Sequence, residues 1–158
     1  MAVKKITLLC LSLLLLFFGN IPASARDMDF SSPEATFKTY LRACKAMDFE
    51  KADMCYTKEF RDFIKTNKRY RAHRHPGQLK NEYHYLHGKK YKLERHGRKA
   101  IMRFSKEFDR PEPLYFVKER GAWKIDGMFS FDNVVIEDSA HWHWRNPSID
   151  NEKEWLRK

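Results

Sequence analysis

The sequence predicts an α+β fold, in which N-terminal helices pack on an antiparallel sheet. Two observations support this prediction. Residues 31–66 repeat apolar side chains at helical spacing behind residues that can cap helices, and residues 91–125 alternate apolar and polar side chains across two short turns. A run of helices followed by a run of antiparallel strands is typical of the α+β class.

The first helix is expected to begin at Pro33. Ser32 can cap it, Pro33 suits the first helical position, and Glu34 favours the positive end of the helix dipole. Asp48 and Thr57 can each cap a further short helix. Apolar residues recur at helical spacing along the first helix, at Phe37, Tyr40, Leu41, Cys44 and Met47.

Two β-hairpins are predicted, over residues 91–104 and 114–125. The Gly97-Arg98 turn of the first suits type II′ because Gly stands at its first position. Arg120-Gly121 forms the second turn, and Trp123 is expected to anchor the core. The alternation agrees across both turns, so the sheet is expected to bury one face. That face carries Tyr91, Leu93, Ala100, Met102, Phe104, Leu114, Phe116, Trp123 and Ile125, with Arg95 at its rim.

The remaining segments give weaker patterns. Pro76-Gly77 indicates a turn, and residues 82–86 resemble a short strand. Residues 134–136 and 141–144 are expected to form a last pair of strands. Residues 150–158 suit either a terminal helical turn or a frayed tail.

Residues 1–25 have the pattern of a secretory signal peptide. A charged start at Lys4 and Lys5 precedes an apolar run, and Ala23-Ser24-Ala25 forms a cleavage site. An uncleaved anchor is the alternative, but the run is shorter than the roughly 20 residues that a spanning helix needs. We therefore expect cleavage near Ala25, a periplasmic or secreted location and no transmembrane segment afterwards. Residues 26–158 have the size of one domain.

Cys44 and Cys55 follow the signal segment. In an oxidising compartment, two cysteines in a short chain can form a disulfide. An antiparallel pair of the first two helices would bring them close. Two buried free thiols are the alternative.

The chain also resembles the nuclear-transport-factor-2-like superfamily, which includes ketosteroid isomerase and polyketide cyclases. The resemblance covers residues 31–136 and rests on the segments 32–35, 46–52 and 121–126. It implies a cone-shaped fold, with a strongly curved sheet around a pocket that the first helix closes. The pocket-lining residues would then be Tyr40, Tyr91, Leu93, Arg95, Met102, Phe104, Phe116 and Trp123.

Enzymes resembling ketosteroid isomerase need Asp, Glu or His on this apolar face. The inward-facing strand positions hold none, and Asp126 is expected to be a solvated strand residue. No catalytic residue is therefore carried over, and no cofactor motif is present. The pairs His73-x-His75 and His141-x-His143 lack a fixed third ligand, so no metal site is expected. In the second pair the tryptophans are expected to be buried and the histidines exposed.

A basic segment is the other candidate site. No acidic residue lies between Asp62 and Glu82, and the net charge of the chain is +10. Arg69, Arg71 and Arg74 are expected to bind an anionic envelope component or an acidic partner. The alternative is a solvated basic face. Because export is expected, nucleic acid is not an expected partner.

The sequence therefore favours a non-catalytic exported binding module. It would use the pocket for a small apolar or amphipathic ligand, or the basic face for an anionic partner. An isomerase or hydrolase of the same fold is one alternative. A structural or interaction protein whose pocket is filled by its own side chains is another, and a homodimer is compatible with each.

Overall fold

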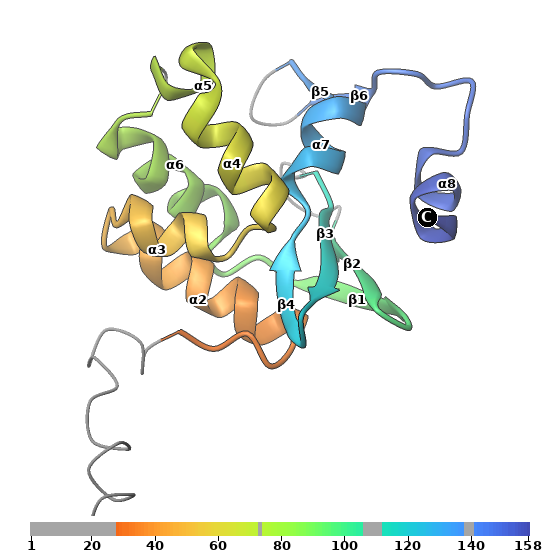
Figure 1. Ribbon diagram of the computed structural model, residues 1–158, viewed down its shortest axis with the longest axis horizontal. Coiled ribbons are helices and arrows are strands. Elements are labelled where there is room, and N and C mark those ends of the chain that lie inside the picture. The colour runs from red at the N-terminus through yellow and green to blue at the C-terminus, as the bar shows by residue number, and fades with distance from the viewer. Residues whose placement is uncertain (1–27, 73, 106–111, 138–140) are drawn as a thin grey trace, which may run out of the picture.

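The computed structural model describes residues 28–72, 74–105, 112–137 and 141–158, so the expected signal peptide lies outside the described residues. The α+β class is confirmed, with helices followed by a four-stranded antiparallel sheet (Figure 1). The elements are α2 (Pro33–Lys45), α3 (Phe49–Met54), α4 (Lys58–Thr66), α5 (Lys68–Ala72), α6 (Pro76–Leu86), β1 (Tyr91–His96), β2 (Lys99–Phe104), β3 (Leu114–Glu119), β4 (Ala122–Ile125), α7 (Gly127–Asn133), β5 (Val134–Ile136), β6 (Trp142–Trp144) and α8 (Asn151–Arg157).

The three expected helix caps are confirmed. The side chains of Ser32, Asp48 and Thr57 each accept a hydrogen bond from the backbone N–H three residues later. These bonds satisfy N–H groups that have no partner within the helix. The capping residues therefore fix where α2, α3 and α4 begin.

Both predicted hairpins have the expected register. Arg95 pairs with Ala100 in the first, and Lys118 pairs with Trp123 in the second. Gly97 has φ +60°, as a type II′ turn requires at its first central residue. In the second turn both central residues, Arg120 and Gly121, have positive φ, at 49° and 87°, which is the type I′ pattern. The strands lie in the order β1-β2-β3-β4.

The main core lies between α2 and the sheet. Phe37 and Cys44 of α2 pack in one cluster with Met102 and Phe116 of the strands. Trp123 belongs to the same cluster and is only 5% exposed, which confirms it as a core residue. Burial of these side chains supplies the main driving force for packing the helices on the sheet.

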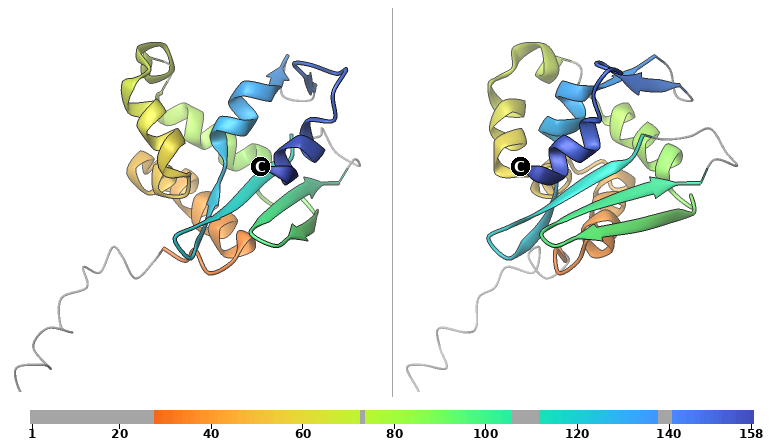
Figure 2. Two further views of the ribbon diagram at one scale, coloured as in Figure 1. Left: turned by 45° about the vertical axis from the view of Figure 1, so that its right-hand side comes forward. Right: turned by 90° about the vertical axis from the view of Figure 1, so that its right-hand side faces the viewer.

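The opposite face of the sheet is also buried, so the expectation of one buried face is wrong. Ile101 and Tyr115 point to this face and are 1% and 0% exposed. They pack against Trp155 of α8, with half-buried Phe129 of α7 beside them. Residues 151–157 thus form a helix that covers the sheet on the side away from α2 (Figure 2).

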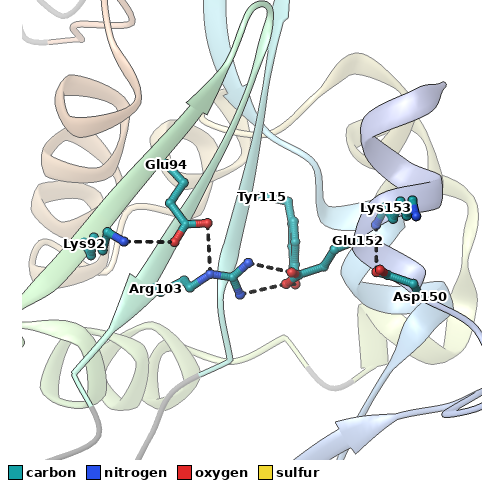
Figure 3. A network of polar contacts seen from close by, with 7 residues as sticks. All are labelled: Lys92, Glu94, Arg103, Tyr115, Asp150, Glu152 and Lys153. Carbon is teal, nitrogen blue, oxygen red and sulfur yellow. Dashed lines mark hydrogen bonds and ion pairs between the residues drawn. The ribbon is translucent and has the colours of Figure 1, made fainter.

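A polar network fastens α8 to the strands (Figure 3). The guanidinium of Arg103 donates two hydrogen bonds to the carboxylate of Glu152, at 2.8 and 2.5 Å. The hydroxyl of Tyr115 donates to the same carboxylate at 2.7 Å. Glu94 of β1 accepts a further bond from Arg103 at 3.3 Å, so the network joins three strands to α8.

Two local predictions are wrong, and one is confirmed. Residues 82–86 form the end of α6 rather than a strand, because Pro76 occupies the first helical turn and does not mark a turn. Phe129 and Phe131 lie on α7, which Asp126 caps. The last pair of strands is confirmed as β5 and β6.

Candidate functional site

A cavity of about 450 Å³ is the candidate site. This volume is within the range of small-molecule pockets. The cavity lies among four helices (α2, α4, α5 and α6), the start of β3, the end of β4, and α7 with β5; the segments that follow α3, precede β3 and follow β6 each contribute one side chain. Its lining residues are Tyr40, Tyr56, Phe60, Tyr70, Gln78, Glu82, Glu112, Leu114, Ile125, Gly127, Ser130, Phe131, Val134, Val135, Ile136 and Arg145.

One part of the cavity wall is aromatic. The rings of Tyr40 and Tyr56 meet edge to face with their centroids 5.6 Å apart, and the hydroxyl of Tyr56 donates to that of Tyr40 at 3.0 Å. Phe60 packs between the rings of Tyr56 and Tyr70. Burial raises the pKa of the Tyr40 and Tyr56 hydroxyls, so both stay neutral at physiological pH. The wall offers uncharged aromatic surface with a few hydroxyl groups.

Two carboxylates line the same cavity. Glu82 comes from α6, and Glu112 comes from the segment that enters β3. Burial, with a further contribution from the charge of Glu112, raises the pKa of Glu82 to about 7. Burial also raises the pKa of Glu112. Within the described residues, no side chain forms an ion pair or hydrogen bond with the carboxylate of Glu82.

Gln78 adds a third acceptor, one turn before Glu82 on α6. Its Oε1 atom is buried and has no hydrogen-bond partner among the described residues. Arg145 is the one cationic side chain in the described lining, and its guanidinium donates to the backbone carbonyl of Asp132 at 2.9 Å. The interior of the cavity is therefore rich in acceptors and poor in positive charge.

The structure places most of the residues expected to line a pocket elsewhere. Tyr40 does line the cavity. Four others are buried in the main core, where α2 packs on the sheet; they are Met102, Phe104, Phe116 and Trp123. Tyr91 is partly exposed, Leu93 is half-buried, and Arg95 forms an ion pair with Glu34 at 2.9 Å.

Glu82 and Glu112 were missed because they do not lie on strands. Alternation along residues 82–86 suggested a strand, but Leu79, Glu82 and Leu86 share one face of a helix, since they are three and four residues apart. Reading Pro76 as a helix start would have placed Glu82 on the buried face. Glu112 stands between two prolines, and no periodic pattern points to it.

The three arginines expected to bind anions do not act as one group. Arg74 donates two hydrogen bonds to the carboxylate of Asp53, at 2.9 and 2.7 Å, and lies 4.4 Å from the ring centroid of Phe49. Asp53 lies on α3, outside the segment of the sequence that lacks acidic residues, and the fold brings it next to Arg74. Arg69 and Arg71 are exposed. Arg74 is therefore a structural residue rather than a free anion ligand.

The two cysteines are free thiols, both buried in the main core. Burial raises the pKa of each to about 12. This is the second of the two alternatives that the sequence left open, and it suits small apolar side chains within a packed core.

The described part of the chain contains no group of three His, Cys, Asp or Glu residues able to hold a metal ion. His73 lies outside the described residues, and His75, His141 and His143 are exposed. Trp142 and Trp144, which alternate with them, are half-buried. None of the described helices is long and apolar enough to cross a membrane.

Comparison of the chain with protein-family models, with curated proteins and with solved structures gives no significant match in any of the three.

Proposed function

We propose that this protein is an exported, non-catalytic binding module whose cavity takes a small amphipathic organic cation. A quaternary or primary ammonium group on a short apolar body is the chemical class we expect. Residues 1–25 support export, because they have the charged start, apolar run and cleavage site of a signal peptide.

One observation carries the proposal: aromatic faces and two carboxylates line the same cavity, and no cationic side chain among the described residues pairs with either carboxylate. A cation gains from the faces of Tyr and Phe rings, and this attraction increases when water is excluded. It also neutralises carboxylates that burial otherwise makes costly to ionise. An anion would be repelled by Glu82 and Glu112, and a neutral apolar ligand would leave both unpaired.

The apolar part of the proposed ligand matches the remaining lining. Leu114, Ile125 and Val134 supply aliphatic surface, while Phe131 and Ile136 are substantially exposed. Ile136 is 58% exposed, so the cavity wall continues to the protein surface. An alkyl chain on the cation could contact this surface while the charged group lies near Glu82.

The proposal is tested by calorimetric titration with hexyltrimethylammonium at pH 8, beside a matched pair of smaller probes. The pair is choline and 3,3-dimethylbutan-1-ol, in which a carbon atom replaces the ammonium nitrogen. We expect the ammonium compounds to bind and the neutral alcohol to bind at least tenfold more weakly.

Two substitutions test whether the cation binds in the cavity. Glu82→Gln should weaken hexyltrimethylammonium binding at least tenfold. Glu154→Gln, at an exposed position on α8, should leave it unchanged. Equal affinity for choline and the alcohol, or equal affinity of wild type and Glu82→Gln for the cation, would contradict the proposal.

A second candidate function is acid–base catalysis on a ligand in the same cavity. The observation that favours it is the pKa of Glu82, which burial and Glu112 raise to about 7, the range in which a general acid or base works best. Deuterium uptake by a carbon acid such as cyclohexanone in D₂O tests it. Faster exchange with wild type than with Glu82→Gln would support catalysis, and equal rates would reject it for this substrate class.

A further inference from the structure

We infer that a cationic ligand enters the cavity in exchange for a proton that Glu82 and Glu112 share, so that acidification releases the ligand. This inference rests on the proposed function and concerns the regulation of the same site. It follows from the position of the two carboxylates and from the groups that surround them.

The two carboxylates line one desolvated space, and among the described residues no cationic side chain pairs with either of them. Arg145, which lines the same cavity, donates instead to the backbone carbonyls of Asp132 and Phe131. Both line the cavity, and Glu82 has no hydrogen-bond or ion-pair partner among the described residues. Glu112 accepts a hydrogen bond from its own backbone N–H. Two like charges in such a site cannot both ionise easily, so one proton remains in the empty cavity near neutral pH. Burial, and after it the charge of Glu112, raises the pKa of Glu82.

The other polar groups in the described lining do not titrate in the same range. Tyr40 lies on α2, Tyr56 lies in the segment that follows α3, and Tyr70 lies on α5. Burial raises the pKa of each of these hydroxyls. They stay protonated between pH 5 and 8. Gln78 is neutral, and Arg145 stays charged because an arginine does not lose its proton in this range.

Two ion pairs lie on elements next to the cavity. Arg74 and Asp53 lie next to Tyr70 and neutralise each other. His143 of β6 lies 3.3 Å from Glu137, and neither belongs to the cavity lining. Glu82 and Glu112 are therefore the groups of the described lining that can exchange a proton as the pH changes around neutrality.

The exchange conserves charge inside the cavity. The empty site holds two carboxyl groups and one proton; the occupied site holds two carboxylates and the ligand cation, and the proton passes to solvent. Affinity should then fall about tenfold for each pH unit below the pKa of the pair, because one proton competes with one ligand.

The experiment is calorimetric titration of the full chain with hexyltrimethylammonium, whose charge does not depend on pH. Titrations at pH 6 in two buffers of different ionisation enthalpy give the number of protons released. We expect about one proton per ligand at pH 6, much less than one at pH 8, and an affinity about tenfold weaker at pH 6 than at pH 8.

Two variants and one direct measurement complete the design. Glu112→Gln removes the repulsion and should reduce the number of protons released at pH 6, while Glu154→Gln should not change it. If Glu112→Gln does not fold, ¹³C NMR titration of the wild-type carboxyl carbons measures the same coupling, because the Glu82 signal should titrate near neutral pH without ligand and below it with ligand.

The outcomes separate the two proposals. Binding without proton release, and with equal affinity at pH 6 and 8, would overturn the exchange and leave the proposed function standing. Absence of binding at every pH would overturn both.

Discussion

The indole Nε1 of Trp155 donates a 2.8 Å hydrogen bond to the Oδ2 atom of Asp126. The Oδ1 atom of the same carboxylate accepts the backbone N–H of Phe129 at 3.0 Å and so caps α7. One side chain therefore fixes the start of α7 and holds α8 on the sheet. Asp126 is a structural residue, not the solvated strand residue that the alternating pattern of the strand predicted.

Substitution of Trp155 tests this link. Trp155→Phe keeps an aromatic ring in the site but removes the donor, and should lower the free energy of unfolding by about 1.5–3 kcal/mol, the range for a hydrogen bond to a charged group. Trp155→Ala also empties the buried site and should cost about 3–5 kcal/mol. Urea denaturation measures both. Lys153→Ala, at an exposed position on α8, is the control, and a Trp155→Phe variant as stable as this control would show the bond to be unimportant.

The Arg103–Glu152 pair should make stability depend on acidity. Burial alone would raise the pKa of Glu152, but the hydrogen bonds from Arg103 and Tyr115 outweigh it, so the pKa lies below its usual value. A lowered folded-state pKa gives stability that is present above about pH 4.5 and is lost as the pH falls through the folded pKa. Glu152→Gln should therefore be less stable than wild type at pH 7, with the difference shrinking below about pH 4. A difference that does not change between pH 7 and pH 3 would contradict this expectation.

Arg74 should affect stability more than Arg69 and Arg71 do. Arg74→Gln leaves the half-buried Asp53 without its partner and should cost about 1–3 kcal/mol. Gln at the exposed positions 69 and 71 should change stability by less than about 0.5 kcal/mol. Urea denaturation of the three single variants decides the matter. Equal stability of all three variants would indicate that Arg74, like Arg69 and Arg71, makes no stabilising contact.

The cysteines should resist chemical modification in the folded protein. Both are buried, and burial raises the pKa of each to about 12, so neither forms the reactive thiolate at pH 8. Iodoacetamide should label neither in the native protein and both after denaturation without reductant, as counted by mass spectrometry. Absence of labelling after denaturation would indicate a disulfide, and rapid native labelling would indicate exposure.

Glu82 should reduce stability above neutral pH. The unfolded chain releases this proton near the ordinary glutamate pKa, whereas the folded protein holds it until about pH 7. Between these values the folded state binds more protons, so its stability falls as the pH rises. Glu82→Gln removes this cost and should be more stable than wild type by about 1–3 kcal/mol at pH 8, and nearly equal to it at pH 4.5.

Urea denaturation at the two pH values measures this difference, with Glu154→Gln as the exposed control. A Glu82→Gln variant that is less stable at pH 8 would mean that Glu82 has a stabilising partner. Gain of stability on removing a polar group is common where that group serves binding rather than folding.

The sequence predicted the hairpins and caps well because both depend on local rules. A two-residue turn fixes the pairing of Arg95 with Ala100 and of Lys118 with Trp123, and a capping side chain acts within three residues. The resemblance to a cone-shaped fold predicted a pocket beneath α2, where the structure has a packed core. Tyr40 was the residue of that prediction that also lines the cavity.

The acidic residues of the cavity could not be predicted in the same way. Glu82 looks solvent-exposed in a strand and becomes buried only when the segment is helical. Its relation to Glu112 is tertiary, since 30 positions of sequence separate residues that line one cavity. The same holds for Arg74 and Asp53, whose pairing depends on how α3 and the segment before α6 meet.

The arrangement of α8 has a consequence for the order of folding. The α2 side of the sheet is covered by helices that precede the strands in the chain, so that half can assemble as soon as β4 has been synthesised. On the other side, Ile101 and Tyr115 lack the cover of Trp155 until residues 151–157 arrive, and only side chains such as Phe129 of α7 pack there before that. During synthesis, the strands would therefore exist for a time with one incompletely covered apolar face. That interval is when a chaperone would be most needed, because exposed apolar sheet surface promotes aggregation.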